Sequence, residues 1–184
     1  NSSDNKFSKP LEAQIMDWSD DVAYSVHDFE DALQAGLISV SSFRSDIEKL
    51  WDSSADENLP NLTQSEFEKG LDRLQALSCW PNNFDGSHGA MARLKDLTSQ
   101  LIGRFVLAAE NKTRAIYGDE PLARYGANLE IPREAKVEVD FLKAVAGHYL
   151  ISAAASQERY AKQQVVIHDL VEVSYFFLPI RILT

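Results

Sequence analysis

The sequence predicts an all-α protein of about five helices, folded as a single helical domain over residues 1–184. Apolar residues recur with a period of about 3.6 along most of the chain, and no stretch shows the sustained alternation typical of a β-strand. With 184 residues, 45% of them hydrophobic, the chain is long enough to bury one core. The two observations together favour packed helices over a mixed or disordered chain.

Charge and cysteine content limit the functions that we consider. The net charge of −10 argues against non-specific binding to double-stranded nucleic acid or to anionic membranes, because both need a basic surface. No apolar run is long enough to span a bilayer. The single cysteine, Cys79, cannot form an internal disulfide and is typical of a small core residue in a reducing compartment. We therefore expect a cytoplasmic protein without a membrane partner.

The first predicted helix, residues 8–36, has two opposed faces. Ser8 and Pro10 suit its first turn, and Gly36 suits its end. One face is apolar over an arc of roughly 80° and is expected to be buried; it comprises Leu11, Ile15, Trp18, Val22, Val26, Phe29 and Leu33. The opposite face groups four carboxylates around a phenol: Asp17, Asp20, Tyr24, Asp28 and Asp31.

This acidic face has two interpretations. Charge opposite an apolar stripe is typical of a solvated surface helix, which is the commoner case. However, no Lys or Arg lies between Leu11 and Leu37, whereas solvated helices usually mix the two signs of charge at i,i+4. Crowded carboxylates without basic neighbours favour a compensating ligand, such as a divalent cation or a metal-bound phosphate.

Two shorter helices are predicted next. Ser41 or Ser42 can cap a helix that runs through Trp51. Thr63 and Glu66 have the spacing of a capping box, which predicts the start of a third helix. The turn residues between these helices predict a loop.

Two long helices complete the predicted domain, over residues 90–118 and 133–173, the second opened by Pro132. The expected core positions of the last helix are Val137, Phe141, Val145, Tyr149 and Ile167. Residues 174–184 form an atypical apolar tail. Because large apolar patches are uncommon on monomers, its Tyr-Phe-Phe-Leu segment predicts a homo-oligomer, most simply a two-fold dimer.

Three basic residues on the long helices are candidates for a site. Arg104 lies among apolar neighbours, and a buried guanidinium needs an anionic partner, so it is our candidate for contact with a bound phosphate. Lys143 is more typical of a salt bridge or of a stem lying along apolar surface. We do not expect His148 to be a metal ligand.

Two segments resemble a known family. Asp20-Asp-Val-Ala-Tyr24-Ser-Val-His-Asp28-Phe-Glu-Asp31 resembles the Asp-Asp-Ile-(small)-Tyr-x-x-x-Asp-Leu-Glu-Asp segment of deoxyguanosine triphosphate triphosphohydrolase-like enzymes. These enzymes belong to the HD-domain phosphohydrolase superfamily. Residues 132–149, with their Glu-Val-x-x-Leu-Lys element, are similar to the C-terminal associated region of that family.

The resemblance implies an activity and a set of roles. The reaction would convert a deoxynucleoside triphosphate and water into a deoxynucleoside and triphosphate. Asp20 would be a ligand of Mg²⁺, Mn²⁺ or a similar divalent metal, and Tyr24 and Asp28 would contact the deoxyribose. In the family, the other metal ligands form a His…His-Asp element before this segment, and the nineteen residues that precede Asp20 do not contain it.

We therefore expect no catalytic residue in this chain and no activity from the chain alone. A fragment, a split-gene product and a decayed relative are all compatible with the pattern. The alternative function is that of a non-catalytic helical module, which keeps the packing and oligomer contacts of the family without its chemistry.

Overall fold

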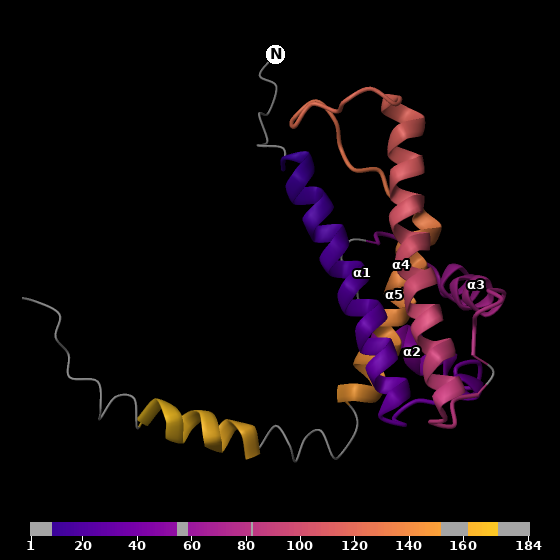
Figure 1. Cartoon of the computed structure of the whole chain (residues 1–184), viewed down its shortest axis with the longest axis vertical. Helices are drawn as coiled ribbons and strands as arrows, with labels where there is room; N and C mark the ends of the chain where they lie inside the picture. Colours follow the sequence, from indigo (N-terminus) through magenta and orange to yellow (C-terminus); the bar gives the residue numbers. More distant parts are fainter. Residues whose placement is uncertain (1–8, 55–58, 82, 152–161, 173–184) are drawn as a thin grey trace, which may run out of the picture.

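The computed structural model describes residues 9–54, 59–81, 83–151 and 162–172 (Figure 1). Its labelled elements are α1 (Leu11–Gln34), the 3₁₀ turn η1 (Val40–Ser42), α2 (Ile47–Ser53), α3 (Gln64–Gln75), α4 (His88–Tyr117), α5 (Arg133–Ala146) and the π-helical turn η2 (Gly147–Ile151). Residues 162–172 are also α-helical. The described residues contain no strand, so the all-α prediction is confirmed, with six α-helices rather than about five. None of these described helices has the length and apolar character needed to cross a bilayer.

The long helix α1 uses its apolar face as the sequence predicts, with one exception. Trp18, Val22 and Phe29 are at most 7% exposed and contribute to the core. Ile15 was expected in the same buried stripe but is 45% exposed. It lies beside Met16, which is also exposed.

The core is built around α5, which packs against α1, α2 and α3. Nearly every position of α5 from Ala135 to Ala146 is buried, as expected for a helix surrounded by others. Aromatic rings fill the centre: Phe141 lies 5.9 Å from Phe43 and 5.2 Å from Phe67, measured between ring centroids. Each fully buried Phe contributes roughly 1.5–3 kcal/mol of transfer free energy.

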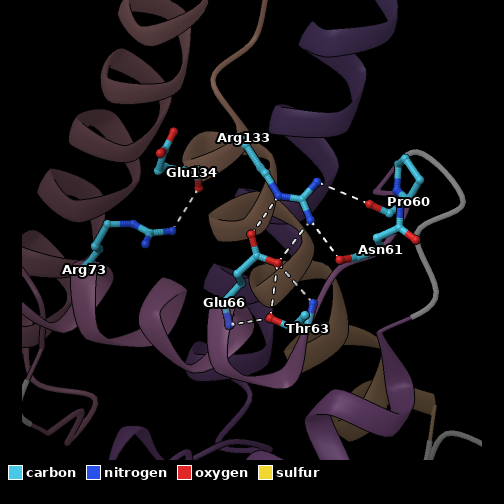
Figure 2. A network of polar contacts seen from close by, with 7 residues as sticks. All are labelled: Pro60, Asn61, Thr63, Glu66, Arg73, Arg133 and Glu134. Carbon is cyan, nitrogen blue, oxygen red and sulfur yellow. Dashed lines mark hydrogen bonds and ion pairs between the residues drawn. The ribbon is translucent and has the colours of Figure 1, made fainter.

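The start of α3 is tied to the start of α5 by a polar network (Figure 2). The predicted capping box is confirmed, since Thr63 and Glu66 hydrogen-bond to each other's backbone N–H. The Arg133 guanidinium donates to both oxygens of Glu66, at 2.8 and 3.1 Å, and also to the carbonyls of Pro60 and Asn61. Hydrogen bonds from Arg133 and from the Thr63 backbone lower the pKa of Glu66 to about 2.

About one helical turn after Glu66, α3 and α5 approach closely at Gly70. A Cβ added to Gly70 would lie 3.0 Å from Cγ1 of Val137, which is tighter than ordinary van der Waals contact. The absence of a side chain at Gly70 therefore lets α3 pack directly on the α5 surface.

The last predicted helix differs from the structure. The α-helix that begins at Arg133 ends at Ala146 and passes into the π-helical turn, so residues 133–151 are not one continuous α-helix. Ile167, expected in the core, lies on the helix of residues 162–172 and is 60% exposed. The apolar tail of residues 174–184, on which the predicted oligomer rests, lies outside the described residues.

The turn η2 is attached to the helices before it by hydrogen bonds. The Tyr149 hydroxyl donates to Oδ2 of Asp46 at 2.6 Å, and Nδ1 of His148 lies 3.3 Å from the Ser53 hydroxyl. The predicted helix from Ser41 or Ser42 through Trp51 is broken into η1, a turn and α2. Phe43 is nevertheless fully buried in that turn, as its apolar character predicts.

The loop between α4 and α5 is fixed against both α4 and α1. The backbone N–H of Glu130 donates to the Thr113 hydroxyl at 2.9 Å. Gln14 of α1 donates to Oδ1 of Asn128 and accepts from the backbone N–H of Leu129, at 3.1 and 3.0 Å. These contacts place the end of the loop beside the first turns of α1.

Candidate functional site

The acidic face of α1 lines a pocket between α1, α5 and the loop that precedes α5. The pocket has a volume of about 630 Å³ and is open to solvent. On the α1 side it is lined by Asp17, Asp20, Asp21 and Tyr24. Its opposite wall is formed by Leu129 and Ile131 of the loop and by Lys136 and Val139 of α5.

The three aspartates in this pocket differ in their partners. Asp17 forms an ion pair with Lys9, and Oδ1 of Asp21 lies 2.7 Å from Nζ of Lys143. The salt bridge expected of Lys143 is thus confirmed, and it joins α5 to α1. Asp20 has no ion-pair partner among the described residues, so its carboxylate is available to a ligand.

Tyr24 follows Asp20 by one helical turn and is 67% exposed, with its side chain at the pocket wall. Asp28 lies one turn further along the same face but does not line this pocket. The pKa of Asp28 is raised because neighbouring atoms partly desolvate its carboxyl group and Asp31 repels the ionised form, although His27 opposes both effects. The structure therefore brings Asp20 and Tyr24 into one pocket, whereas Asp28 is not among the residues that line it.

The acidic groups of the described chain do not form a metal site by themselves. No group of three or more His, Cys, Asp or Glu side chains among the described residues could hold a metal ion. Mg²⁺ and Mn²⁺ prefer octahedral sets of oxygen donors, and Asp20 can supply only part of such a set. Further ligands would have to come from outside the described residues.

Arg104 finds its anionic partner inside the chain. Its guanidinium donates to Oε2 and Oε1 of Glu138 at 2.8 and 2.9 Å, and Nε of Arg73 donates to the same carboxylate at 2.6 Å. Glu138 is 1% exposed. The hydrogen bonds from Arg104 to Glu138 raise the pKa of the Arg104 guanidinium. The need for an anion, which suggested a bound phosphate, is therefore met by Glu138.

A second buried carboxylate, Glu30, lies on the other side of α1 from the pocket. Oε2 of Glu30 accepts a hydrogen bond of 2.8 Å from Thr98, and Glu30 also pairs with Lys95 of α4. Burial alone would raise the pKa of Glu30, but these hydrogen bonds and the charge of Lys95 outweigh it and lower the pKa. Glu30 thus fixes α4 to α1 and is separate from the acidic face.

The sequence did not identify Lys136 as a residue of the pocket. It also did not identify Glu138 and Glu30 as the buried partners of Arg104 and Lys95. One signal for Glu138 was present, because it lies between the apolar residues Val137 and Val139, and a charge that becomes buried among apolar residues needs a partner. Nothing comparable marks Lys136, whose place opposite α1 depends on how the helices pack.

Comparison with curated proteins identifies relatives over most of the chain. A protein of Streptomyces coelicolor named "deoxyguanosinetriphosphate triphosphohydrolase-like protein" is 49% identical over 165 residues, which cover 88% of this chain and 39% of the relative. Over the matched residues, the chain is homologous to this triphosphohydrolase-like protein. The family suggested by the acidic segment is thus confirmed.

Other triphosphohydrolase-like relatives show the same coverage. The Bifidobacterium longum protein is 34% identical over 174 residues, 90% of this chain and 35% of the relative. The Corynebacterium glutamicum protein is 34% identical over 164 residues, 84% of this chain and 37% of the relative. The chain therefore spans less than two fifths of the length of each of these relatives. No family model and no solved structure matches it.

Proposed function

We propose that this chain supplies one wall of the nucleotide site of a deoxynucleoside triphosphate triphosphohydrolase. The observation that carries the proposal is the unpaired Asp20 carboxylate, which lines a pocket of about 630 Å³ next to Tyr24. It is supported by a relative named deoxyguanosinetriphosphate triphosphohydrolase-like protein, which is 49% identical over 88% of this chain. The complete enzyme would cleave a deoxynucleoside triphosphate with water to yield a deoxynucleoside and triphosphate.

In this proposal Asp20 is one ligand of a divalent metal, Mg²⁺, Mn²⁺ or a similar ion, which would supply Lewis acidity at the phosphates. Tyr24 and Asp28 contact the deoxyribose through their polar atoms. These three residues follow one another at intervals of one helical turn, over about 12 Å of α1. The remaining metal ligands belong to a part of the enzyme outside the described residues, and the chain alone is inactive.

Arg104, which the sequence suggested as a phosphate contact, has a structural role in this proposal. Since Glu138 accepts two hydrogen bonds from Arg104, we propose that the guanidinium joins α4 to α5 rather than binding the triphosphate. We also propose a homo-oligomer formed through the apolar tail of residues 174–184. Light scattering at the monomer mass would count against that assembly.

The second candidate is a non-catalytic helical module. It is favoured by the incomplete ligand set of the described residues. Such a module would retain the packed core and the pocket without hydrolysing any nucleotide.

A fusion protein distinguishes the two candidates. The part of the Streptomyces relative outside the matched region is joined to this chain. Release of deoxynucleoside and triphosphate is then measured with each of the four common deoxynucleoside triphosphates. We expect the fusion protein to hydrolyse these substrates. Asp20→Ala should abolish hydrolysis, whereas Asp31→Ala, on the same face about three turns away, should leave it unchanged. A folded fusion that hydrolyses none of the four would favour the module.

A further inference from the structure

The wall of the pocket opposite Asp20 carries one cation. Of the residues that the structure describes, Lys136 of α5 is the only basic one that lines the pocket, and it is partly buried there. Among the described residues, it forms no ion pair with any Asp or Glu, in contrast to Lys143, which lies about two turns further along the same face of α5. Its neighbours Ala135, Val137 and Val139 are buried, so α5 presents little other than Lys136 at this point of the pocket.

The charges of the pocket balance except at two positions. Lys9 compensates Asp17, and Lys143 compensates Asp21. Asp20 and Lys136 remain, with opposite charges on opposite walls, and they form no ion pair with each other. A ligand that satisfies both must present positive charge to Asp20 and negative charge to Lys136. A polyphosphate that carries a divalent cation has this combination of charges.

The order of these groups along the pocket is set by the direction of the helices. Gln14 contacts Leu129, just before α5, and Asp21 contacts Lys143, near the end of α5, so α1 and α5 run in the same direction. Lys136 precedes Lys143 by seven residues, about 10 Å along the helix axis. Lys136 therefore lies toward the N-terminal end of α1, and Tyr24 lies on the other side of Asp20.

We propose that Lys136 binds the terminal phosphates of the substrate and so fixes which way the nucleotide lies in the pocket. The inference rests on the proposed function, in which Asp20 marks the metal-bound phosphates and Tyr24 the sugar. Along α1 the order is then Lys136, Asp20 and Tyr24, which matches the order of terminal phosphates, metal and sugar in a metal-bound nucleotide. An ammonium group suits this task, because it binds phosphate as a compact point charge.

The test measures binding of the phosphate part and of the deoxynucleoside part of the nucleotide separately. The ¹⁵N-labelled chain is titrated by NMR, in the presence of Mg²⁺, with inorganic tripolyphosphate, with deoxyguanosine and with dGTP. Lys136→Ala is compared with Lys136→Arg, which keeps the charge, and with Lys112→Ala, which removes an exposed lysine of α4 outside the pocket. In the fusion protein, the Michaelis constant and turnover number for dGTP are measured for the same variants.

We expect Lys136→Ala to weaken tripolyphosphate and dGTP binding by about 10- to 150-fold, as for loss of one charge-assisted hydrogen bond. Deoxyguanosine binding should not change, and Lys112→Ala should leave all three affinities unchanged. Lys136→Arg should retain most of the phosphate affinity. The dGTP Michaelis constant of the Lys136→Ala fusion should rise with little change in turnover number.

Two results would overturn the inference. Equal tripolyphosphate affinity and equal Michaelis constant in Lys136→Ala and the unmodified protein would remove Lys136 from the site, while hydrolysis by the fusion would leave the proposed function intact. An equal loss for deoxyguanosine and tripolyphosphate would show a general structural effect. If the unmodified chain binds none of the three probes and the fusion hydrolyses nothing, the proposed function itself fails.

Discussion

Removal of Arg104 tests whether this residue stabilises the fold or binds substrate. Arg104→Ala deletes two of the three hydrogen bonds that Glu138 accepts and leaves the one from Arg73. A hydrogen bond to a charged group contributes roughly 1.5–3 kcal/mol. Because the Arg104 side chain is 39% exposed, solvent screening reduces this contribution. We therefore expect a loss of about 2 kcal/mol in the free energy of unfolding.

The partners of Arg104 provide the controls for this estimate. The double variant Arg73→Ala, Arg104→Ala leaves Glu138, which is 1% exposed, without a cation, and should lose about 4 kcal/mol. Adding Glu138→Met removes the buried charge and should recover most of the loss, because an apolar residue of similar volume often replaces a buried ion pair without cost.

The assays are urea denaturation and thermal melting. For a chain of this length, 1 kcal/mol corresponds to about 2–4 °C in Tm, so Arg104→Ala should melt about 4–8 °C lower. Affinity for tripolyphosphate should be unchanged in the same variant. An unaltered Tm together with lost tripolyphosphate affinity would refute this reasoning and return Arg104 to the substrate site.

Three further predictions concern titratable groups. Because its pKa is raised in the fold, ionised Asp28 costs stability above that pKa; Asp28→Asn should therefore raise Tm at pH 7, with the difference disappearing on acidification below about pH 4. It should also weaken deoxynucleoside binding, and a lowered Tm at neutral pH would argue against the desolvation that we describe. Glu66, with a pKa of about 2 beside Arg133, contributes stability that is present above its unfolded pKa of about 4.5 and is lost as pH falls toward 2. Melts of Glu66→Gln should thus converge with those of the unmodified chain across that acidic range, and a difference that persists at pH 2 would contradict the assignment. Finally, calorimetry should show weak or no Mn²⁺ binding by the chain alone, since Asp20 is one ligand of an incomplete set; micromolar affinity that is lost in Asp20→Ala would reveal ligands that we have missed.

Features that depend on neighbouring residues in the chain were predictable. The apolar face of α1 and the capping box of α3 follow from helical period and from local hydrogen bonding. The grouping of Asp20 with Tyr24 also follows, because residues four apart share a helix face. The start of α5 after Pro132 was predicted from the fixed backbone angle of proline.

Features that depend on packing were not predictable from the sequence alone. Glu138 meets Arg104 across 34 residues of chain and Arg73 across 65, and no periodic signal specifies such a pair. The apolar pattern also continues past Ala146, although the α-helix gives way there to a π-helical turn. Lys136 belongs to the pocket only because α5 lies along α1 in the same direction.

The continuity of α1 fixes the dimensions of the proposed site. From Leu11 to Gln34 the helix contains no glycine or proline, and its inner face is held in the core. Asp20, Tyr24 and Asp28 therefore move as one rigid body, and their axial spacing cannot adapt to a longer or shorter ligand. The distances between these side chains along α1 are therefore constant, so any adjustment to different nucleotides must occur in the loop before α5 and in the surfaces that face α1.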